Sequence, residues 1–63
     1  MSTTLDNAIR EAFRLATTYN EGAVVMSRDD LEETGRYYAL VEGEETQKID
    51  DFGDKIVLFI NIM

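Results

Sequence analysis

The last nine residues, KIVLFINIM (55–63), place the strongest constraint on what this chain can fold into. Alternate side chains of a β-strand point to opposite faces of its sheet. One face of this segment would carry Ile56, Leu58, Ile60 and Ile62. The other face would carry Val57, Phe59, Asn61 and Met63. Because both faces are mostly apolar, the segment is typical of a strand in a sheet that is covered on both sides.

The first third of the chain predicts one amphipathic helix. Apolar residues recur at steps of three and four from Leu5 to Tyr19, which is the spacing of a single buried stripe. Glu11 lies beside this stripe, where it can pair with Arg14 three residues later. The helix is expected to end near Tyr19, because residues 20–22 (Asn-Glu-Gly) favour a turn.

Two further strands are expected before the C-terminal one. Residues 23–26 form a short β-branched run, and residues 36–42 are rich in strand-forming side chains. The segment between them, SRDDLEETG (27–35), fits either a single helical turn or a loop that connects the strands. Residues 44–54 are polar and are expected to form a connection with a turn at Gly53.

These elements predict a single α+β domain over residues 1–63, with an N-terminal helix packed on a small, mainly antiparallel sheet of three strands. One helix covers only one face of such a sheet, so the other face of the last strand needs a second cover. The chain has no Cys and no His, so disulfides and the commonest zinc ligands cannot reinforce so small a domain. We therefore expect a homodimer built on the C-terminal strand or its outer face. The residues expected at its interface are Val57, Phe59, Ile60 and Ile62.

Acidic residues dominate the charge of the chain and concentrate in its middle. The chain has 13 acidic and 6 basic residues and a net charge of −7. Residues 29–54 contain ten of the acids but only Arg36 and Lys48 as bases, whereas the segments on either side are close to neutral. Binding to phosphates relies on Lys and Arg, so direct binding to nucleic acid is not expected.

No catalytic, cofactor or metal motif is recognisable in the sequence. Without His, no Ser, Thr or Lys has a visible activating base. Asp50 and Asp54 could act as the paired carboxylates of a glycosidase, but a domain this small can hardly form the concave substrate site that such chemistry needs. The spacing of the acids does not match a calcium loop, and Asp51-Phe52-Gly53 matches the kinase magnesium motif in letters only. We expect no enzymatic activity, no cofactor and no metal site.

The sequence also bears on location. The N-terminus, MSTTLDNAIR, lacks the layout of a signal peptide, and the longest apolar run is far shorter than a membrane span. Without Cys there is also no sign of an oxidising compartment. We therefore expect a cytoplasmic protein that does not enter membranes.

The acidic middle of the chain has two interpretations. Carboxylates that only keep a small dimer soluble would serve best if they were interspersed with bases. Concentrated charge destabilises a compact state by self-repulsion, which favours a role in binding a basic surface. Glu42 and Glu44 on an extended chain would stand about 6.6 Å apart, comparable with neighbouring phosphates of a nucleic acid. The residues expected to bind the partner are Asp29, Asp30, Glu32, Glu33, Glu42, Glu44, Glu45, Asp50, Asp51 and Asp54.

In its small size, its acidity and the charge layout of residues 29–54, the chain resembles the DNA-mimic proteins of bacteriophages and mobile elements. Such proteins occupy the DNA-binding surfaces of host proteins, among them histone-like nucleoid proteins and restriction enzymes, and they share no single fold. The resemblance implies an inhibitor with a basic nucleic-acid-binding protein as its partner, acting in the host cytoplasm if a phage encodes it. A dimeric histone-like protein would suit a small acidic dimer best.

Two other interpretations of function stay open. The chain could be a structural or regulatory dimerisation module whose acidity serves solubility. It could also be an inhibitor that inserts an apolar side chain, such as Tyr37, Tyr38 or Phe52, into its partner.

Overall fold

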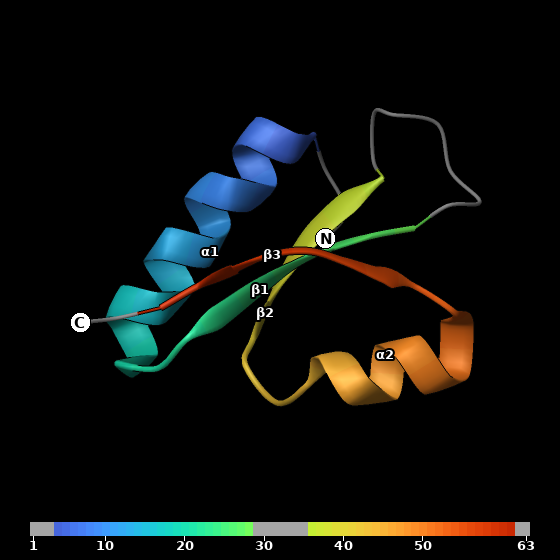
Figure 1. The fold of residues 1–63 in the computed structure, drawn as a ribbon. Coiled ribbons are helices and arrows are strands. Elements are labelled where there is room, and N and C mark those ends of the chain that lie inside the picture. Colours follow the sequence, from blue (N-terminus) through green and yellow to red (C-terminus); the bar gives the residue numbers. More distant parts are fainter. Residues whose placement is uncertain (1–3, 29–35, 62–63) are drawn as a thin grey trace.

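Two helices and three strands make up the part of the chain, residues 4–28 and 36–61, that the computed structural model describes (Figure 1). In chain order the elements are helix α1 (Leu5–Tyr19), strand β1 (Ala23–Ser27), strand β2 (Tyr37–Val41), helix α2 (Glu45–Phe52) and strand β3 (Lys55–Ile60). The predicted α+β fold, with an N-terminal helix and a three-stranded antiparallel sheet, is confirmed. Helix α2 is an addition that the sequence does not predict.

Helix α1 packs on the sheet through a stripe of small side chains. Ala8, Ala12 and Ala16 are buried, and their spacing of four residues places them on one face of the helix. Alanine side chains let the helix approach the sheet closely, while larger, half-buried residues pack at its margins. The helix ends where predicted, because Asn20 adopts a left-handed conformation (φ 53°) and its N–H bonds to the carbonyl of Ala16.

Strand β1 is the central strand of the sheet, and all five of its residues are buried. It pairs antiparallel with β2 on one side and with β3 on the other, so β2 and β3 are edge strands of the described sheet. Ala23 and Val25 face α1, whereas Val24 and Met26 face the opposite side of the sheet. The core therefore lies on both sides of β1.

Strand β3 contains an irregularity that changes which side chains share a face. Its pairing with β1 shifts by one residue at Val57, as in a β-bulge. Ile56 pairs with Met26 beyond this shift, so its side chain lies on the same face as that of Phe59. Strict alternation predicts Ile56 beside Leu58 on the other face. That prediction is wrong, because a one-residue shift moves the residues beyond it to the opposite face.

Helix α2 lies on the face of the sheet opposite α1 and follows the turn after β2 (Figure 1). None of its residues is buried, and its two apolar side chains, Ile49 and Phe52, are exposed. This weak apolar pattern explains why the sequence of residues 44–54 predicts only a connection. Helix α2 thus covers part of the second face of the sheet. The expectation of a single helix did not include this cover. Residues 29–35, where a helical turn or a loop is expected, lie outside the described residues.

Gly53 provides a test of how α2 ends. It adopts a left-handed conformation (φ 71°), and its N–H bonds to the carbonyl of Ile49 at 2.9 Å. A Cβ atom at this position would meet no heavy atom within 4 Å, so only the backbone conformation disfavours another residue. We expect Gly53→Ala to lower the free energy of unfolding by roughly 1–2 kcal/mol, measured by urea denaturation.

Asn tolerates the left-handed region better than Ala, so Gly53→Asn is the matched control and should lose less stability. An alanine variant as stable as the wild type would show that α2 does not end at Gly53 in this way.

Candidate functional site

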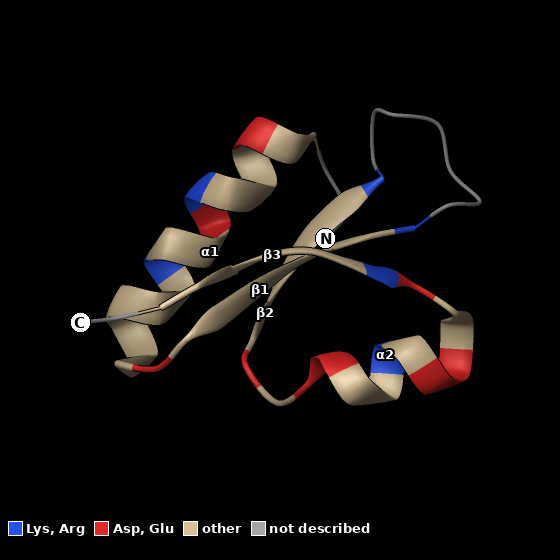
Figure 2. Ribbon diagram, in the orientation of Figure 1, with Lys and Arg blue, Asp and Glu red and all other residues tan. Residues whose placement is uncertain are grey.

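Acidic and basic residues are distributed differently on the two helices (Figure 2). Along α1, acids and bases are mixed, and Arg14 donates hydrogen bonds to the carboxylate of Glu11, as predicted. Along α2 and the turn before it, carboxylates dominate. We call the following set of residues the α2 acidic surface: Glu42, Glu44, Glu45, Asp50 and Asp51.

Most of the α2 acidic surface is open to solvent. Its exposed members are Glu42, Glu44, Asp50 and Asp51. Glu45 is half-buried, and its carboxylate accepts a hydrogen bond from the N–H of Gly43 at 2.6 Å, which stabilises the turn that leads into the helix. The fold therefore places four predicted partner-binding residues in α2 or directly before it, one of them with a structural role as well. The carboxylate of the fifth, Glu42, lies beside Gly22.

The turn before α2 does not hold its acids on an extended chain. Glu44 has a helical backbone conformation (φ −83°, ψ −13°), and its N–H bonds to the carbonyl of Val41. The expectation that Glu42 and Glu44 follow one another as on a strand is therefore wrong, and a spacing of about 6.6 Å does not apply to them. From Glu45 onward the chain is helical and rises about 1.5 Å per residue.

Asp54 is a predicted partner-binding residue that the structure places inside the protein. It is 7% exposed, and its carboxylate accepts a hydrogen bond from the hydroxyl of Tyr38, which is 9% exposed. A buried carboxylate with an internal partner does not belong to a binding surface, so this prediction is wrong. The bond instead connects the segment after α2 with strand β2.

The other predicted site residues lie in different places. Four acids and one apolar residue fall outside the described residues: Asp29, Asp30, Glu32, Glu33 and Ile62. Val57 and Phe59 are exposed on the edge strand β3, whereas Ile60 is half-buried against the core under α1.

The aromatic residues considered for insertion into a partner differ in accessibility. Tyr38 is buried, and Tyr37 is half-buried against the core under α1. Phe52 is 67% exposed at the end of α2. Of these three side chains, Phe52 is therefore the one that a partner could reach.

The last turn of α2 carries charge at an unfavourable position. The C-terminal end of a helix bears a partial negative charge, and a carboxylate near it is destabilising by about 0.3–1 kcal/mol at low salt. Asp50 and Asp51 occupy this end, and the last turn contains no basic residue. Asp50 and Asp51 are therefore not placed for stability, unlike Glu45 in the first turn of the helix.

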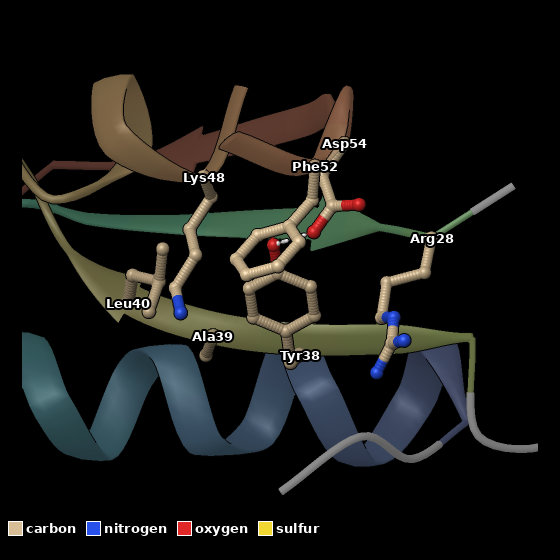
Figure 3. Close-up of a pocket in the computed structure, with 7 residues that line it drawn as sticks. All are labelled: Arg28, Tyr38, Ala39, Leu40, Lys48, Phe52 and Asp54. Carbon is tan, nitrogen blue, oxygen red and sulfur yellow. Dashed lines mark hydrogen bonds between the residues drawn. The ribbon is translucent and has the colours of Figure 1, made fainter. Parts of the chain in front are cut away.

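A pocket lies between α2 and the sheet (Figure 3). The space stays open because none of the side chains of α2 is buried against the sheet. Its volume is about 310 Å³, and two basic and two aromatic side chains contribute to its lining: Arg28, Lys48, Tyr38 and Phe52. The Nζ atom of Lys48 lies 5.4 Å from the centre of the Phe52 ring. The sequence does not predict this pocket, although a base and an aromatic residue four positions apart would share one face of a helix.

The hydrogen bond between Tyr38 and Asp54 should make a measurable contribution to stability. Tyr38→Phe removes the donor and leaves a buried carboxylate unpaired, so we expect the free energy of unfolding to fall by about 1–3 kcal/mol in urea denaturation. Tyr37→Phe is the matched control and should change stability by less than about 0.5 kcal/mol. Equal losses in the two variants would contradict this role of the bond.

The wild type and Tyr38→Phe should also differ in how their stability responds to alkaline pH. Burial raises the pKa of Tyr38 above its ordinary value of 10.0, and the hydrogen bond to Asp54 acts in the same direction. As pH rises, the unfolded chain therefore loses this proton before the folded one does. The stability that depends on the protonated hydroxyl is present below about pH 10 and is lost above it, so the advantage of the wild type over Tyr38→Phe should shrink there.

Within residues 4–28 and 36–61, no three acidic side chains converge as a metal site requires. Neither of the two helices is long and apolar enough to cross a bilayer. Comparison of the chain with protein-family models, curated proteins and solved structures gave no match.

Proposed function

We propose that this protein is a small acidic inhibitor that uses the α2 acidic surface to occupy the basic DNA-binding surface of a host protein. The observation that carries the proposal is the segregation of charge, with four carboxylates in or directly before an eight-residue helix and mixed charges along α1. Clustered Lys and Arg residues would be attracted to this surface, and such clusters are typical of proteins that bind DNA or RNA. A dimeric histone-like nucleoid protein is the partner we propose first.

The charge density of the α2 acidic surface supports mimicry of a nucleic acid. A DNA duplex carries one negative charge per about 1.7 Å of its axis, or about seven over 12 Å. Helix α2 has eight residues and is therefore about 12 Å long. Three carboxylates, of Glu45, Asp50 and Asp51, lie within the helix, and its one basic residue, Lys48, lines the pocket beside it. The number of carboxylates per length of helix is therefore a little under half the number of phosphates per length of DNA.

The position of Asp50 and Asp51 also supports a role in binding. Solubility requires net charge but no particular place for it. Two carboxylates at the C-terminal end of α2 destabilise a helix that buries no side chain and therefore has little packing to hold it. Departures from a stable arrangement are expected where side chains serve recognition.

Phe52 favours a second mode of binding, in which the end of α2 inserts an aromatic side chain into a partner. It is 67% exposed and follows Asp51 directly, and aromatic residues are frequent anchors of interfaces. Salt distinguishes the two modes. Electrostatic mimicry weakens steeply as salt rises, whereas insertion of Phe52 depends on salt only weakly.

The proposed function predicts that the protein displaces a labelled DNA duplex from a dimeric histone-like nucleoid protein, followed by fluorescence anisotropy at low salt. Asp50→Asn/Asp51→Asn should weaken this displacement roughly 5- to 30-fold, at about 0.5–1 kcal/mol for each surface charge. The same variant should be more resistant to urea than the wild type, because it removes two charges from the unfavourable end of α2.

The matched control is Asp6→Asn/Glu11→Gln, which removes two charges from α1, outside the α2 acidic surface. It should displace DNA within about twofold of the wild type, because distant charges are screened. Equal losses in both double variants would mean that only net charge matters. The proposal fails if no DNA is displaced and if capture from a bacterial lysate at low salt recovers no basic DNA-binding protein.

We also propose that two copies of the chain pair through strand β3. This strand lies at the edge of the described sheet, so one row of its backbone N–H and C=O groups faces away from β1. Val57 and Phe59 are 40% and 48% exposed on it. Antiparallel pairing with β3 of a second copy across a two-fold axis would satisfy the edge and cover these side chains.

The dimer can be tested by sedimentation equilibrium at micromolar concentration, which should give the mass of two chains. Val57→Lys introduces a charge into the edge strand and should raise the dissociation constant at least about tenfold, equivalent to about 1.4 kcal/mol. Thr17→Lys adds the same side chain to an exposed position of α1 and should stay dimeric. A monomer mass that does not change with concentration would contradict the dimer.

A further inference from the structure

The pocket between α2 and the sheet has the shape of a small-molecule site, and the proposed function makes no use of it. Tyr38 and Leu40 of β2 line one side, and Lys48 and Phe52 of α2 line the other (Figure 3). Its volume of about 310 Å³ is at the lower end of the range of about 300–1,000 Å³ that is usual for ligand pockets. A ligand with a single ring, or with two fused rings, fits this space better than a larger ligand.

The charge of the pocket is opposite to that of the protein as a whole. Arg28 and Lys48 line it, and Asp54 is the acidic residue of its lining. The carboxylate of Asp54 already accepts a hydrogen bond from the hydroxyl of Tyr38. Two of the six basic residues in a chain of net charge −7 therefore lie at one pocket.

Two aromatic rings lie between the two basic side chains. In Figure 3, the rings of Phe52 and Tyr38 have Lys48 on one side and Arg28 on the other. Lys48 is positioned by Phe52, because 5.4 Å between Nζ and the ring centre is a favourable cation–π distance.

Arg28 contributes its charge from the end of the pocket nearest the end of β1. Its backbone N–H bonds to the carbonyl of Arg36 at 2.8 Å, which holds this part of the chain next to the residue that precedes β2. Burial raises the pKa of Tyr38, and the charge of Arg28 offsets part of that rise. The positive field of Arg28 therefore reaches the aromatic side of the pocket.

We infer that this pocket binds a small aromatic carboxylate. The flat ring of the ligand lies against Phe52, whose side chain is 67% exposed, and its carboxylate accepts a charge-assisted hydrogen bond from Nζ of Lys48. An uncharged aromatic compound of the same shape loses this bond, and an aliphatic carboxylate loses the contact with the rings. The two requirements together define the class of ligand.

The carboxylates near the pocket do not prevent binding of an anion. Asp50 and Asp51 are exposed, so solvent and salt screen part of their repulsion. Contacts inside a pocket act at hydrogen-bond distance and in a medium of lower dielectric constant, where they are stronger. A hydrogen bond from Lys48 at short range therefore outweighs the screened repulsion.

A nuclear magnetic resonance titration of the wild-type protein with 2-naphthoate tests this inference. We expect saturable shifts of the amide signals of Arg28, residues 38–40, Lys48 and Phe52, with a Kd on the order of 1 mM or tighter. The uncharged analogue 2-naphthamide should bind at least about fivefold more weakly, because it cannot form the charge-assisted bond.

Two variants separate the roles of charge and ring. Lys48→Met keeps an unbranched side chain but removes the charge, and it should weaken binding of 2-naphthoate at least about fivefold. Phe52→Leu keeps an apolar contact but removes the ring, and it should weaken binding about threefold. Arg10→Met on the exposed face of α1 is the matched control and should bind as the wild type does. Far-UV circular dichroism checks that each variant is folded.

The inference is overturned if 2-naphthoate and 2-naphthamide bind equally well, if Lys48→Met binds like the control, or if the shifts spread over the chain without saturating. Asp50→Asn/Asp51→Asn should retain the binding of 2-naphthoate while it loses the displacement of DNA. The pocket and the proposed function can therefore fail independently of each other.

Discussion

The fold depends on the contact between the alanine stripe of α1 and the central strand β1. Ala8, Ala12 and Ala16 let the helix approach Ala23 and Val25, and these five residues form a cluster with almost no exposed surface. A chain of this length buries only about 60% of its unfolded surface, so the packing of this one cluster must supply a large share of the stability. Bulky side chains in the stripe would hold the helix away from β1 and open the cluster to water.

The opposite face of β1 is closed by different means. Val24 and Met26 are fully buried there, although α2 contributes no buried side chain. Tyr38 completes this cluster, and its hydroxyl bonds to Asp54 immediately before β3. One side-chain hydrogen bond thus connects the core to the point where the chain leaves α2. The helix is positioned by its two ends, with little contribution from apolar residues of its own.

Sequence periodicity predicts the elements that have a regular apolar pattern and fails for those that do not. Helix α1 and the three strands have regular apolar patterns, so their existence and their order along the chain follow from the sequence alone. In α2 the two apolar residues are both exposed, so no buried stripe exists to be recognised. The bulge at Val57 shifts the register without changing which residues are apolar. Asp54 has the sequence context of a surface acid, because its partner Tyr38 is 16 residues away.

The weak packing of α2 also explains how one short helix can combine opposite charges. Residues that contribute nothing to a core can vary in polarity without unfolding the domain, so the sequence of α2 is set by other requirements. Its exposed positions include Asp50 and Asp51, whereas Lys48 and Phe52 line the pocket toward the sheet. A helix held mainly at its ends is also the part of the fold that opens most easily. Local freedom of this kind would suit the binding that we propose, and the rigid cluster around β1 would keep the rest of the domain intact during it.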